Sequence, residues 1–414
     1  MIAPGVHGSE LVLDVDSADD PGVRVTARVA ATVRSKSSLL GTSGFYCGDG
    51  LEGREGQDGQ GRMGWKGGRG TMERRDFLMA VGVLGAGAIA RGFPNAFAQT
   101  ASRSAGRVDV HHHVTPPKYL AELSARNLAT PDMTAWSVAR TLDDMDKAGV
   151  TTSVVSITSP AVSFADAELA RRVARESNEW MAGLRRDHPG RFGSFAMLPM
   201  QDVDGSLQEI EYALDTLKAD GIGLLTSYGD KWLGHAMYAP IMNELNRRKA
   251  VLYTHPTLAN CCRGLVPDVA PTVIEFGTDT SRTIADIVFS GTAARCPDVK
   301  FIFSHAGGTV PFLAERFVQA PVINKNLASR VPNGAVYELK RFYYDTAWAY
   351  NPAPLAALTK LVATSQILYG SDYPYRTGSD TVKGLLAYGF SERDMKAIGR
   401  ENAVRLMPRL ASPQ

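Results

Sequence analysis

The segment RVDVHHHVTPP, residues 107–117, places three consecutive histidines directly behind a short apolar run. The whole chain of 414 residues contains eight histidines, so this segment holds a large share of them. In a doubly wound nucleotide-binding sheet, a glycine-rich phosphate loop usually follows the first strand. Histidines occupy that position here, so the segment favours a different parallel α/β fold, the (β/α)8 barrel.

The rest of the chain supports this choice, because short apolar runs recur at regular intervals behind the first one. They span residues 150–157, 191–198, 221–226, 250–254, 299–304, 341–346 and 366–371. Helical patterns separate them, as in 166–189, where Leu169, Val173, Trp180 and Leu184 recur at helical spacing opposite charged residues. Eight strand–helix units in about 300 residues fit one TIM barrel better than a doubly wound sheet. We therefore expect an α/β protein with a single (β/α)8 TIM barrel.

Two connections are longer than the roughly 2–6 residues that are typical of such units. One is 113–133, after the first strand, and the other is 255–280, after the fifth. Both follow the carboxyl end of a strand, which is the face where these barrels keep their active sites. We expect each long connection to act as a lid or as a dimer contact.

Side chains that can bind metal close four of the apolar runs. They are His111, His112 and His113, then His255 in YTHP, His305 in FSHAGG and Asp372 in YGSDYP. Because strand side chains alternate between faces, His111 and His113 share one face, about 6.6 Å apart along the strand. His112 must point toward the helix layer, and we expect it to be structural.

Neutral imidazoles together with one carboxylate suit a divalent transition metal. We expect one ion, Zn²⁺ with Mn²⁺ as the alternative, held by a group of four ligands: His111, His113, His255 and Asp372. A water or the substrate would fill the remaining position, and His305 would serve as acid or base beside it. The run 221–226 contains no lysine, which argues against a two-metal site bridged by a carboxylated lysine.

The first 98 residues differ from the rest. Residues 1–71 are rich in glycine and charge without apolar periodicity, and we expect them to be disordered. Residues 72–98 resemble a twin-arginine export signal, with Arg74 and Arg75 before a small-residue apolar stretch and AFA as a cleavage site. A buried amphipathic helix is the alternative for 72–98.

The apolar stretch in this segment is about a dozen residues long, too short for stable membrane insertion. We therefore expect translation to begin at Met72 and the twin-arginine translocase to export the folded protein to the periplasm, or otherwise out of the cytoplasm. Residues 99–414 would form the mature barrel.

Composition narrows the class of protein. Hydrophobic residues make up 44% and charged residues 21% of the chain, which is ordinary for a globular protein with a real core. The net charge of +2 argues against a nucleic-acid partner and leaves a small acidic substrate open. The four cysteines (Cys47, Cys261, Cys262 and Cys296) form no CxxC motif, so they support neither a zinc ribbon nor a disulfide framework. We expect Cys261 and Cys262 to be plain loop residues, with a redox role as the alternative.

Several of these segments together resemble one family. They are DVHHHVTPP (109–117), YTHP (253–256), FSHAGGTVPFLAERF (303–317), YGSDYPY (369–375) and ENAVRLM (401–407). The chain resembles the amidohydrolase superfamily over roughly residues 107–407, and within it the metal-dependent decarboxylases, such as aminocarboxymuconate-semialdehyde decarboxylase and the salicylate-type enzymes. Some aromatic-acid decarboxylases of this branch carry Glu-x-His on the first strand. The His-x-His of this chain is closer to the muconate-type and methylsalicylate-type enzymes.

The resemblance implies the same metal ligands as above, with His305 beside the ion. It also implies that Arg316 meets the substrate carboxylate, and in the muconate enzyme this arginine comes from the neighbouring subunit, which points to a homodimer. The alternative for Arg316 is a helix-surface residue paired with an acid.

The residues allow decarboxylation of a small hydroxyaromatic or muconate-type acid, in which the metal acts as a Lewis acid and Asp372 or His305 protonates the carbon that loses CO₂. The alternative is hydrolysis of a lactone or amide with the same ligands, and a non-catalytic ligand-binding barrel is a third interpretation. Trp232 could stack on an aromatic substrate or pack in the core. We expect Asp345 to have a structural role and His235 to begin a helix.

Overall fold

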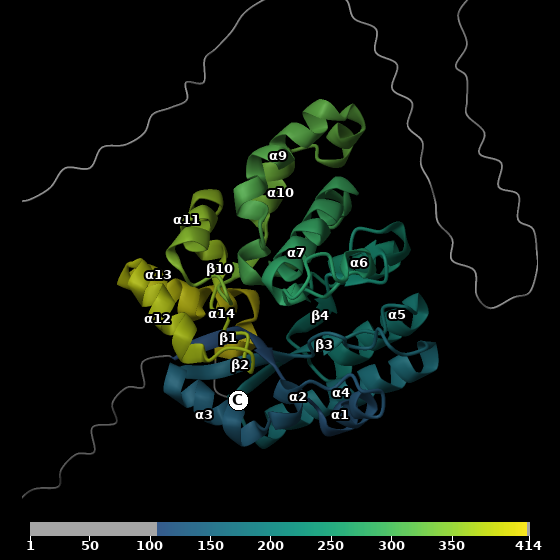
Figure 1. Cartoon of the computed structure of the whole chain (residues 1–414), viewed down its shortest axis with the longest axis vertical. Helices are drawn as coiled ribbons and strands as arrows, with labels where there is room; N and C mark the ends of the chain where they lie inside the picture. The colour runs from purple at the N-terminus through teal and green to yellow at the C-terminus, as the bar shows by residue number, and fades with distance from the viewer. Residues whose placement is uncertain (1–105, 412–414) are drawn as a thin grey trace, which may run out of the picture. The chain divides into compact units, whose positions relative to one another are not determined.

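The computed structural model describes residues 106–411 (Figure 1). The expected disordered segment 1–71 and the expected export signal 72–98 lie outside the described residues. No helix of residues 106–411 is both long enough and apolar enough to cross a membrane.

Eight parallel strands form the centre of the fold, in the order β1-β2-β3-β4-β7-β8-β9-β10. They are β1 (Arg107–His113), β2 (Val150–Ser156), β3 (Phe192–Met197), β4 (Gly221–Leu225), β7 (Val251–His255), β8 (Lys300–Phe303), β9 (Tyr343–Asp345) and β10 (Ile367–Leu368). Backbone hydrogen bonds from Val110 to Tyr369 and from His113 to Tyr373 bring the chain after β10 back to β1. The predicted TIM barrel and all eight of its strands are confirmed.

Helices follow the strands and cover the outside of the barrel (Figure 1). They are α1 (Pro117–Ser124), α2 (Pro131–Ala135), α3 (Val138–Ala148), α4 (Ala167–Asp187), α5 (Val203–Glu211), α6 (Ala239–Arg247), α7 (Pro271–Phe289), α8 (Thr292–Arg295), α9 (Val310–Ile323), α10 (Ala335–Arg341), α11 (Pro352–Leu361), α12 (Gly378–Tyr388), α13 (Glu392–Lys396) and α14 (Asn402–Leu406). A small hairpin, β5 (Ser227–Tyr228) with β6 (Lys231–Trp232), follows β4.

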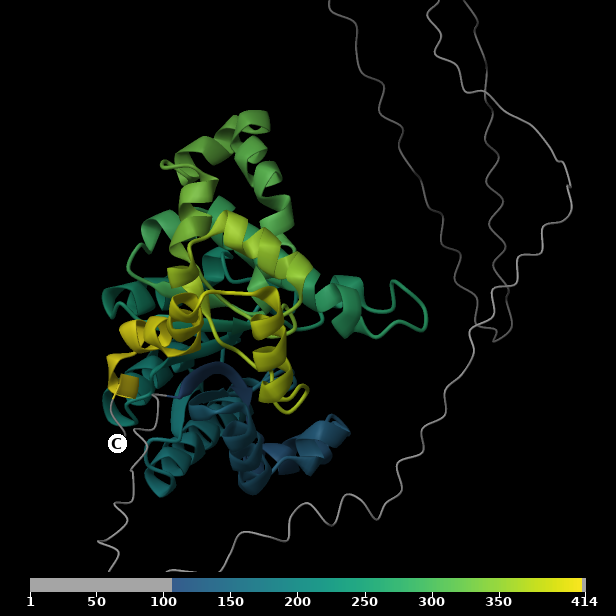
Figure 2. The ribbon, with the colours of Figure 1, turned by 90° about the vertical axis from the view of Figure 1, so that its left-hand side faces the viewer.

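The connection after β7 is shorter than expected. We predicted an irregular segment to residue 280, but α7 begins at Pro271, so the connection is 256–270. Proline is favoured in the first turn of a helix, because its missing N–H has no partner there in any case. In Figure 2 the chain between β7 and α7 projects away from the body of the barrel.

The interior of the barrel is packed rather than open. Its buried side chains include Val108, Val110, Val154, Phe195, Tyr253, Ile302 and Leu368. Ala403, Met407 and Leu410, from α14 and the tail, belong to the same cluster. The Phe195 and Tyr253 rings stack at 5.1 Å, roughly parallel. The side chains expected to bind metal lie beyond this cluster, at the carboxyl ends of the strands.

Candidate metal centre

Imidazoles and a carboxylate from the ends of three strands, β1, β7 and β10, converge at the carboxyl end of the barrel. Asp372 Oδ1 lies 2.9 Å from His111 Nε2, 3.0 Å from His113 Nε2 and 3.8 Å from His255 Nε2. The Nε2 atoms of His111 and His113 are 3.1 Å apart. All four side chains are buried. The structure thus brings together the four residues expected to hold a metal, although they come from opposite ends of the sequence.

His305 belongs to the same cluster but takes a different place in it. His111, His255, His305 and Asp372 each offer a ligand atom, and these atoms lie within 4.8 Å of one another. His305 Nε2 lies 3.4 Å from Oδ2 of Asp372, whereas the other three imidazoles face Oδ1. His305 therefore faces the other carboxylate oxygen, and its expected role as an acid or base beside the ion stays a prediction.

The other ring nitrogen of each expected ligand already has an oxygen partner. His111 Nδ1 lies 2.8 Å from Asp345 Oδ2, and His255 Nδ1 lies 2.9 Å from the Pro256 carbonyl oxygen. Because carboxylates and carbonyls only accept, these Nδ1 atoms carry a proton, and Nε2 is the nitrogen that each ring can offer to a metal. His113 Nδ1 lies 3.2 Å from Ser156 Oγ.

The buried oxygen Asp372 Oδ1 has no hydrogen-bond donor within residues 106–411, although three imidazole nitrogens surround it. A buried carboxylate oxygen without a donor is costly unless a cation compensates it. The donor set, three Nε2 atoms and one carboxylate oxygen, is one that zinc and similar divalent ions accept. The residues present therefore fit one such ion.

Charge in the cluster is divided between neutral and ionised groups. Burial lowers the pKa of His113 to about 3 and that of His255 to about 4, so both rings are neutral near pH 7, as metal ligation requires. Burial would also lower the pKa of His111, but Asp345 and Asp372 outweigh it and raise this pKa to about 10. Burial opposes ionisation of Asp372, yet the charge of the adjacent His111 outweighs it and holds the pKa of this carboxyl well below the ordinary value. Two carboxylates thus attract positive charge to this point.

Backbone strain gathers at the same carboxylate. His305, Trp348 and Asp372 have φ values of 54°, 55° and 68°, in the left-handed region that non-glycine residues rarely adopt. Such strain persists only where the surroundings enforce it, and it clusters at functional sites. All three residues meet at the Asp372 carboxylate, which marks it as the centre of the site.

Sequence reasoning missed Trp348 and Arg376. The Trp348 Nε1–H donates to Asp372 Oδ2 at 2.6 Å, and the Arg376 guanidinium lies 4.0 Å over the Trp348 ring. Trp348 follows β9 by three residues, so its position just beyond a strand's carboxyl end was the available signal. The expected structural role of Asp345 has a specific form, because its carboxylate orients His111 and accepts the His305 backbone N–H at 2.9 Å.

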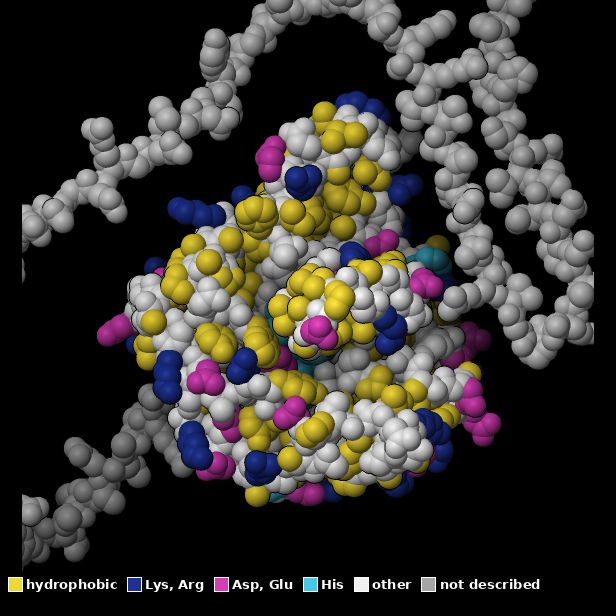
Figure 3. Space-filling view, in the orientation of Figure 1, with side chains coloured by type: hydrophobic (Ala, Val, Ile, Leu, Met, Phe, Trp, Pro, Cys, Tyr) yellow, Lys and Arg dark blue, Asp and Glu magenta, His cyan; other side chains and the backbone are white. Residues whose placement is uncertain are grey.

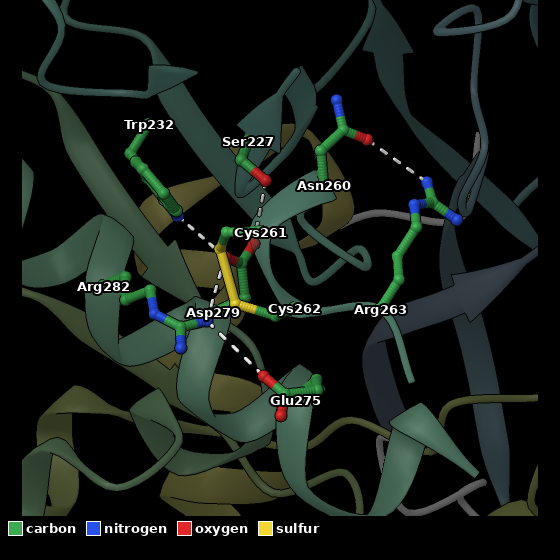
Figure 4. Close-up of a disulfide and its surroundings, with 9 residues drawn as sticks. All are labelled: Ser227, Trp232, Asn260, Cys261, Cys262, Arg263, Glu275, Asp279 and Arg282. Carbon is green, nitrogen blue, oxygen red and sulfur yellow. Dashed lines mark hydrogen bonds and ion pairs between the residues drawn. A yellow bond between two sulfur atoms is a disulfide. The ribbon is translucent and has the colours of Figure 1, made fainter. Parts of the chain in front are cut away.

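Trp232 lies in the hairpin after β4, and its N–H is engaged. Figure 4 shows its Nε1–H directed at Asp279 of α7, with a separation of 2.7 Å. Asp279 also accepts from Ser227 at 3.0 Å. The indole is fixed by this network, and its expected stacking on a substrate stays a prediction.

The expectation that Cys261 and Cys262 are plain loop residues is wrong. The two neighbours form a disulfide within the connection 256–270, close to Trp232 and Asp279 (Figure 4). The two cysteines are adjacent in sequence and form no CxxC pattern, and they lie at the end of a short 3₁₀ turn, Asn260–Cys262.

Three further predicted residues lie away from the cluster's centre. Arg316 is exposed on α9 and makes no ion pair with another residue of 106–411, so its alternative acid partner is not found there, and its expected substrate contact stays a prediction. His235 begins a short helix as predicted, since its Nδ1 accepts from the Met237 N–H. His112 turns away from the metal cluster, and its ring stacks on Tyr373 at 4.8 Å.

The cluster can be reached from the surface. Figure 3 shows histidine side chains on the floor of a hollow in the face toward the viewer. The His305 side chain is 12% exposed, against 0% for His111, so it is the histidine that a small molecule entering this hollow meets more easily.

Comparison with known proteins connects this geometry to a family. A family model described as amidohydrolase matches residues 108–409. The decarboxylase yanB of Aspergillus niger is 37% identical over 328 residues, covering 74% of this chain and 89% of the relative. The 6-methylsalicylic acid decarboxylase of Penicillium expansum is 34% identical over 317 residues, covering 73% of this chain and 97% of the relative.

Solved structures agree on the fold. One is a dihydroxybenzoic acid decarboxylase from Polaromonas sp. JS666, with bound manganese and the inhibitor 2-nitroresorcinol. It superimposes with a TM-score of 0.66 at 24% identity, covering 73% of this chain and 97% of the other.

Proposed function

The chain belongs to the amidohydrolase family and is a carboxy-lyase of its metal-dependent branch, and from this premise we propose that it decarboxylates a hydroxybenzoic acid of the 6-methylsalicylate type. The observation that carries the proposal is the buried Asp372 carboxylate, with three imidazole Nε2 atoms at one oxygen and His305 at the other. The relatives named for decarboxylation of aromatic acids support the substrate class.

His111, His113, His255 and Asp372 would hold the metal, with Zn²⁺ as our first choice because imidazole ligands predominate. Mn²⁺ is the alternative, and the manganese in the Polaromonas structure supports a divalent ion in general. When bound, the ion supplies Lewis acidity to a phenolate or carboxylate oxygen of the substrate.

A side chain of the protein supplies the proton that replaces CO₂ on the substrate. The proton adds to the ring carbon that bears the carboxylate, the bond to that carboxylate breaks, and its electron pair restores the aromatic ring as CO₂ leaves. The low pKa of Asp372 keeps its carboxyl ionised, which makes it a poor proton donor. His305 is less deeply buried and lies 3.4 Å from Asp372 Oδ2, so we assign it the role of the acid.

Incubation of the zinc- or manganese-loaded protein with 6-methylsalicylate tests this function. We expect release of CO₂ and formation of 3-methylphenol, strongly reduced in His305→Asn and retained in the matched control His235→Asn. A protein that leaves hydroxybenzoates unchanged but adds water to a lactone or amide would be a hydrolase instead.

We also propose export through the twin-arginine translocase to the periplasm, supported by the sequence of residues 72–98. Changing both Arg74 and Arg75 to lysine should leave the protein in the cytoplasm. Peptides from residues 1–60 in the exported protein would contradict both the export signal and the start at Met72.

A homodimer is the assembly we propose, with Arg316 reaching the substrate of the neighbouring subunit. Large apolar side chains on the same helix support a partner there, since Phe312 is 86% and Ile323 83% exposed. In Figure 1, α9 projects from the end of the barrel, where a second copy can reach it.

A further inference from the structure

Arg376 stands close to the metal cluster without an acidic partner. It follows Asp372 by four residues, and its backbone N–H donates to the Asp372 carbonyl oxygen at 3.1 Å, which fixes the start of the side chain. Its guanidinium lies 4.0 Å over the Trp348 ring. The side chain is exposed and makes no ion pair within residues 106–411. A cation fixed in place but uncompensated by any carboxylate of the chain is suited to an anion from outside.

Trp348 connects this cation to the reacting centre. One edge of its indole donates to Asp372 Oδ2 at 2.6 Å, while a face of the ring carries Arg376. The residue is 45% exposed and has a φ of 55°, an arrangement that packing alone would not favour for a large aromatic side chain. The strained backbone thus presents the indole at the mouth of the site.

Two other arginines, Arg282 of α7 and Arg263 of the connection 256–270, are less suited to this role. Arg282 lies 3.6 Å from Glu275 and 3.9 Å from Asp279, so its charge is already compensated. Arg263 contacts Asn260 in the projecting connection. A guanidinium stacked on an aromatic face keeps its N–H edge free and meets a carboxylate through two parallel hydrogen bonds.

We propose that Arg376, seated on Trp348, binds the carboxylate of the substrate, and that Trp348 is a positioning residue that fixes both Arg376 and Asp372. The inference rests on the proposed function, because it assigns the recognition of an aromatic acid to a named side chain. It predicts that affinity for the carboxylate and affinity for the rest of the ring depend on different residues.

Binding of two ligands to the metal-loaded full-length protein separates these contributions. The probes are 6-methylsalicylate, measured at a pH or in a variant where turnover is slow, and its carboxylate-free product 3-methylphenol. In Arg376→Gln we expect affinity for 6-methylsalicylate to fall about 10- to 100-fold, the effect of losing a charge-assisted hydrogen-bonded pair. Affinity for 3-methylphenol should stay within about twofold. Arg186→Gln, which removes an exposed arginine of α4, is the matched control.

Trp348→Phe keeps a ring under Arg376 but removes the N–H that Asp372 accepts. We expect kcat to fall while the affinity for 6-methylsalicylate changes little, whereas Trp348→Leu should lower both. Circular dichroism and thermal unfolding confirm that each variant is folded.

Equal weakening of both probes in Arg376→Gln, or no weakening of either, would overturn the inference. A carboxylate-selective loss in Arg316→Gln instead would assign the role to the neighbouring subunit. If the wild-type protein itself neither binds nor decarboxylates 6-methylsalicylate, the proposed function fails, and this inference fails with it.

Discussion

At the scale of single residues, the hydrogen-bond partners of the imidazoles set the chemistry of the site. Asp345 lies at 0% exposure behind His111 and receives its Nδ1–H at 2.8 Å. This contact fixes the ring's tautomer and its orientation toward Asp372. Such a partner cannot be identified from sequence spacing, since Asp345 and His111 are 234 residues apart.

Asp345→Asn tests this contact. An amide oxygen can still accept from Nδ1–H, but the negative charge that makes the imidazole a better ligand is lost, so we expect zinc affinity to fall about 10- to 100-fold. Competition with a chromogenic chelator measures the affinity. Asp143→Asn, at an exposed acid paired with Lys147, is the control. Unchanged zinc affinity in Asp345→Asn would show that the contact does not tune the metal.

The pKa values of the imidazoles predict how the stability of the metal-free protein varies with pH. His113 and His255 have pKa values of about 3 and about 4 when folded, below the ordinary 6.5, so below pH 6.5 the unfolded chain binds more protons than the folded one. Their contribution to stability is present above pH 6.5 and is lost as the pH falls toward 4. His111, raised to about 10, contributes below pH 6.5 and loses that contribution as the pH rises to 10.

We therefore expect the free energy of unfolding of the metal-free protein to be largest near pH 6.5 and to fall on both sides. Urea unfolding across this range measures it. His113→Asn should make the acid side shallower, and His188→Asn, at a helix end outside the cluster, should not. A stability that keeps rising as the pH falls from 6.5 to 4 would contradict the assignment of these rings as buried and neutral.

At the scale of elements, the sequence predicted the strands well because buried parallel strands are short apolar runs. The helix α7 was missed over its first turns because Val273 and Ile274 are 71% and 45% exposed, so its start shows no amphipathic pattern. Trp348 was missed for a similar reason, since its role depends on a backbone φ of 55° that no local pattern reveals. Hydrophobic periodicity predicts which residues are buried. It therefore misses exposed apolar residues, such as those at the start of α7, and residues whose position depends on a strained backbone, such as Trp348.

The turn that carries His305 depends on a close approach to α7. A Cβ at Gly308, whose φ is 64°, would collide with the carbonyl oxygen of Gly277. In Gly308→Ala we expect a loss of about 1–3 kcal/mol of unfolding free energy and a clear fall in kcat, because the turn must move away from the helix. Gly229→Ala is the matched control, with the same φ of 64° and no atom within 4 Å of the new Cβ. Equal effects of the two substitutions would mean that backbone strain, not the collision, limits this turn.

At the scale of the whole molecule, the barrel explains why ligands distant in sequence could be predicted together. The carboxyl ends of parallel strands share one face, so His111, His255 and Asp372 had to lie near one another once the strands were counted. The direction and partner of each side chain could not be predicted, because they depend on packing between elements.

The proposed homodimer can be tested by changing the exposed apolar side chains of α9. Phe312→Ser combined with Ile323→Ser should convert the proposed homodimer to a monomer, since both side chains are more than four-fifths exposed in the single chain. Light scattering coupled to size exclusion measures the mass. Leu386→Ser, at a leucine of α12 that is 61% exposed, should leave the mass unchanged. A wild-type protein with the mass of one chain would contradict the dimer.

Metal analysis of the purified protein, with X-ray absorption at the metal edge, tests the central claim most directly. We predict one divalent ion per chain, coordinated by imidazole nitrogens and a carboxylate oxygen. His113→Ala should lose the ion, and His235→Ala should keep it. Two ions per chain, no retained ion, or an ion without histidine ligands would contradict the account.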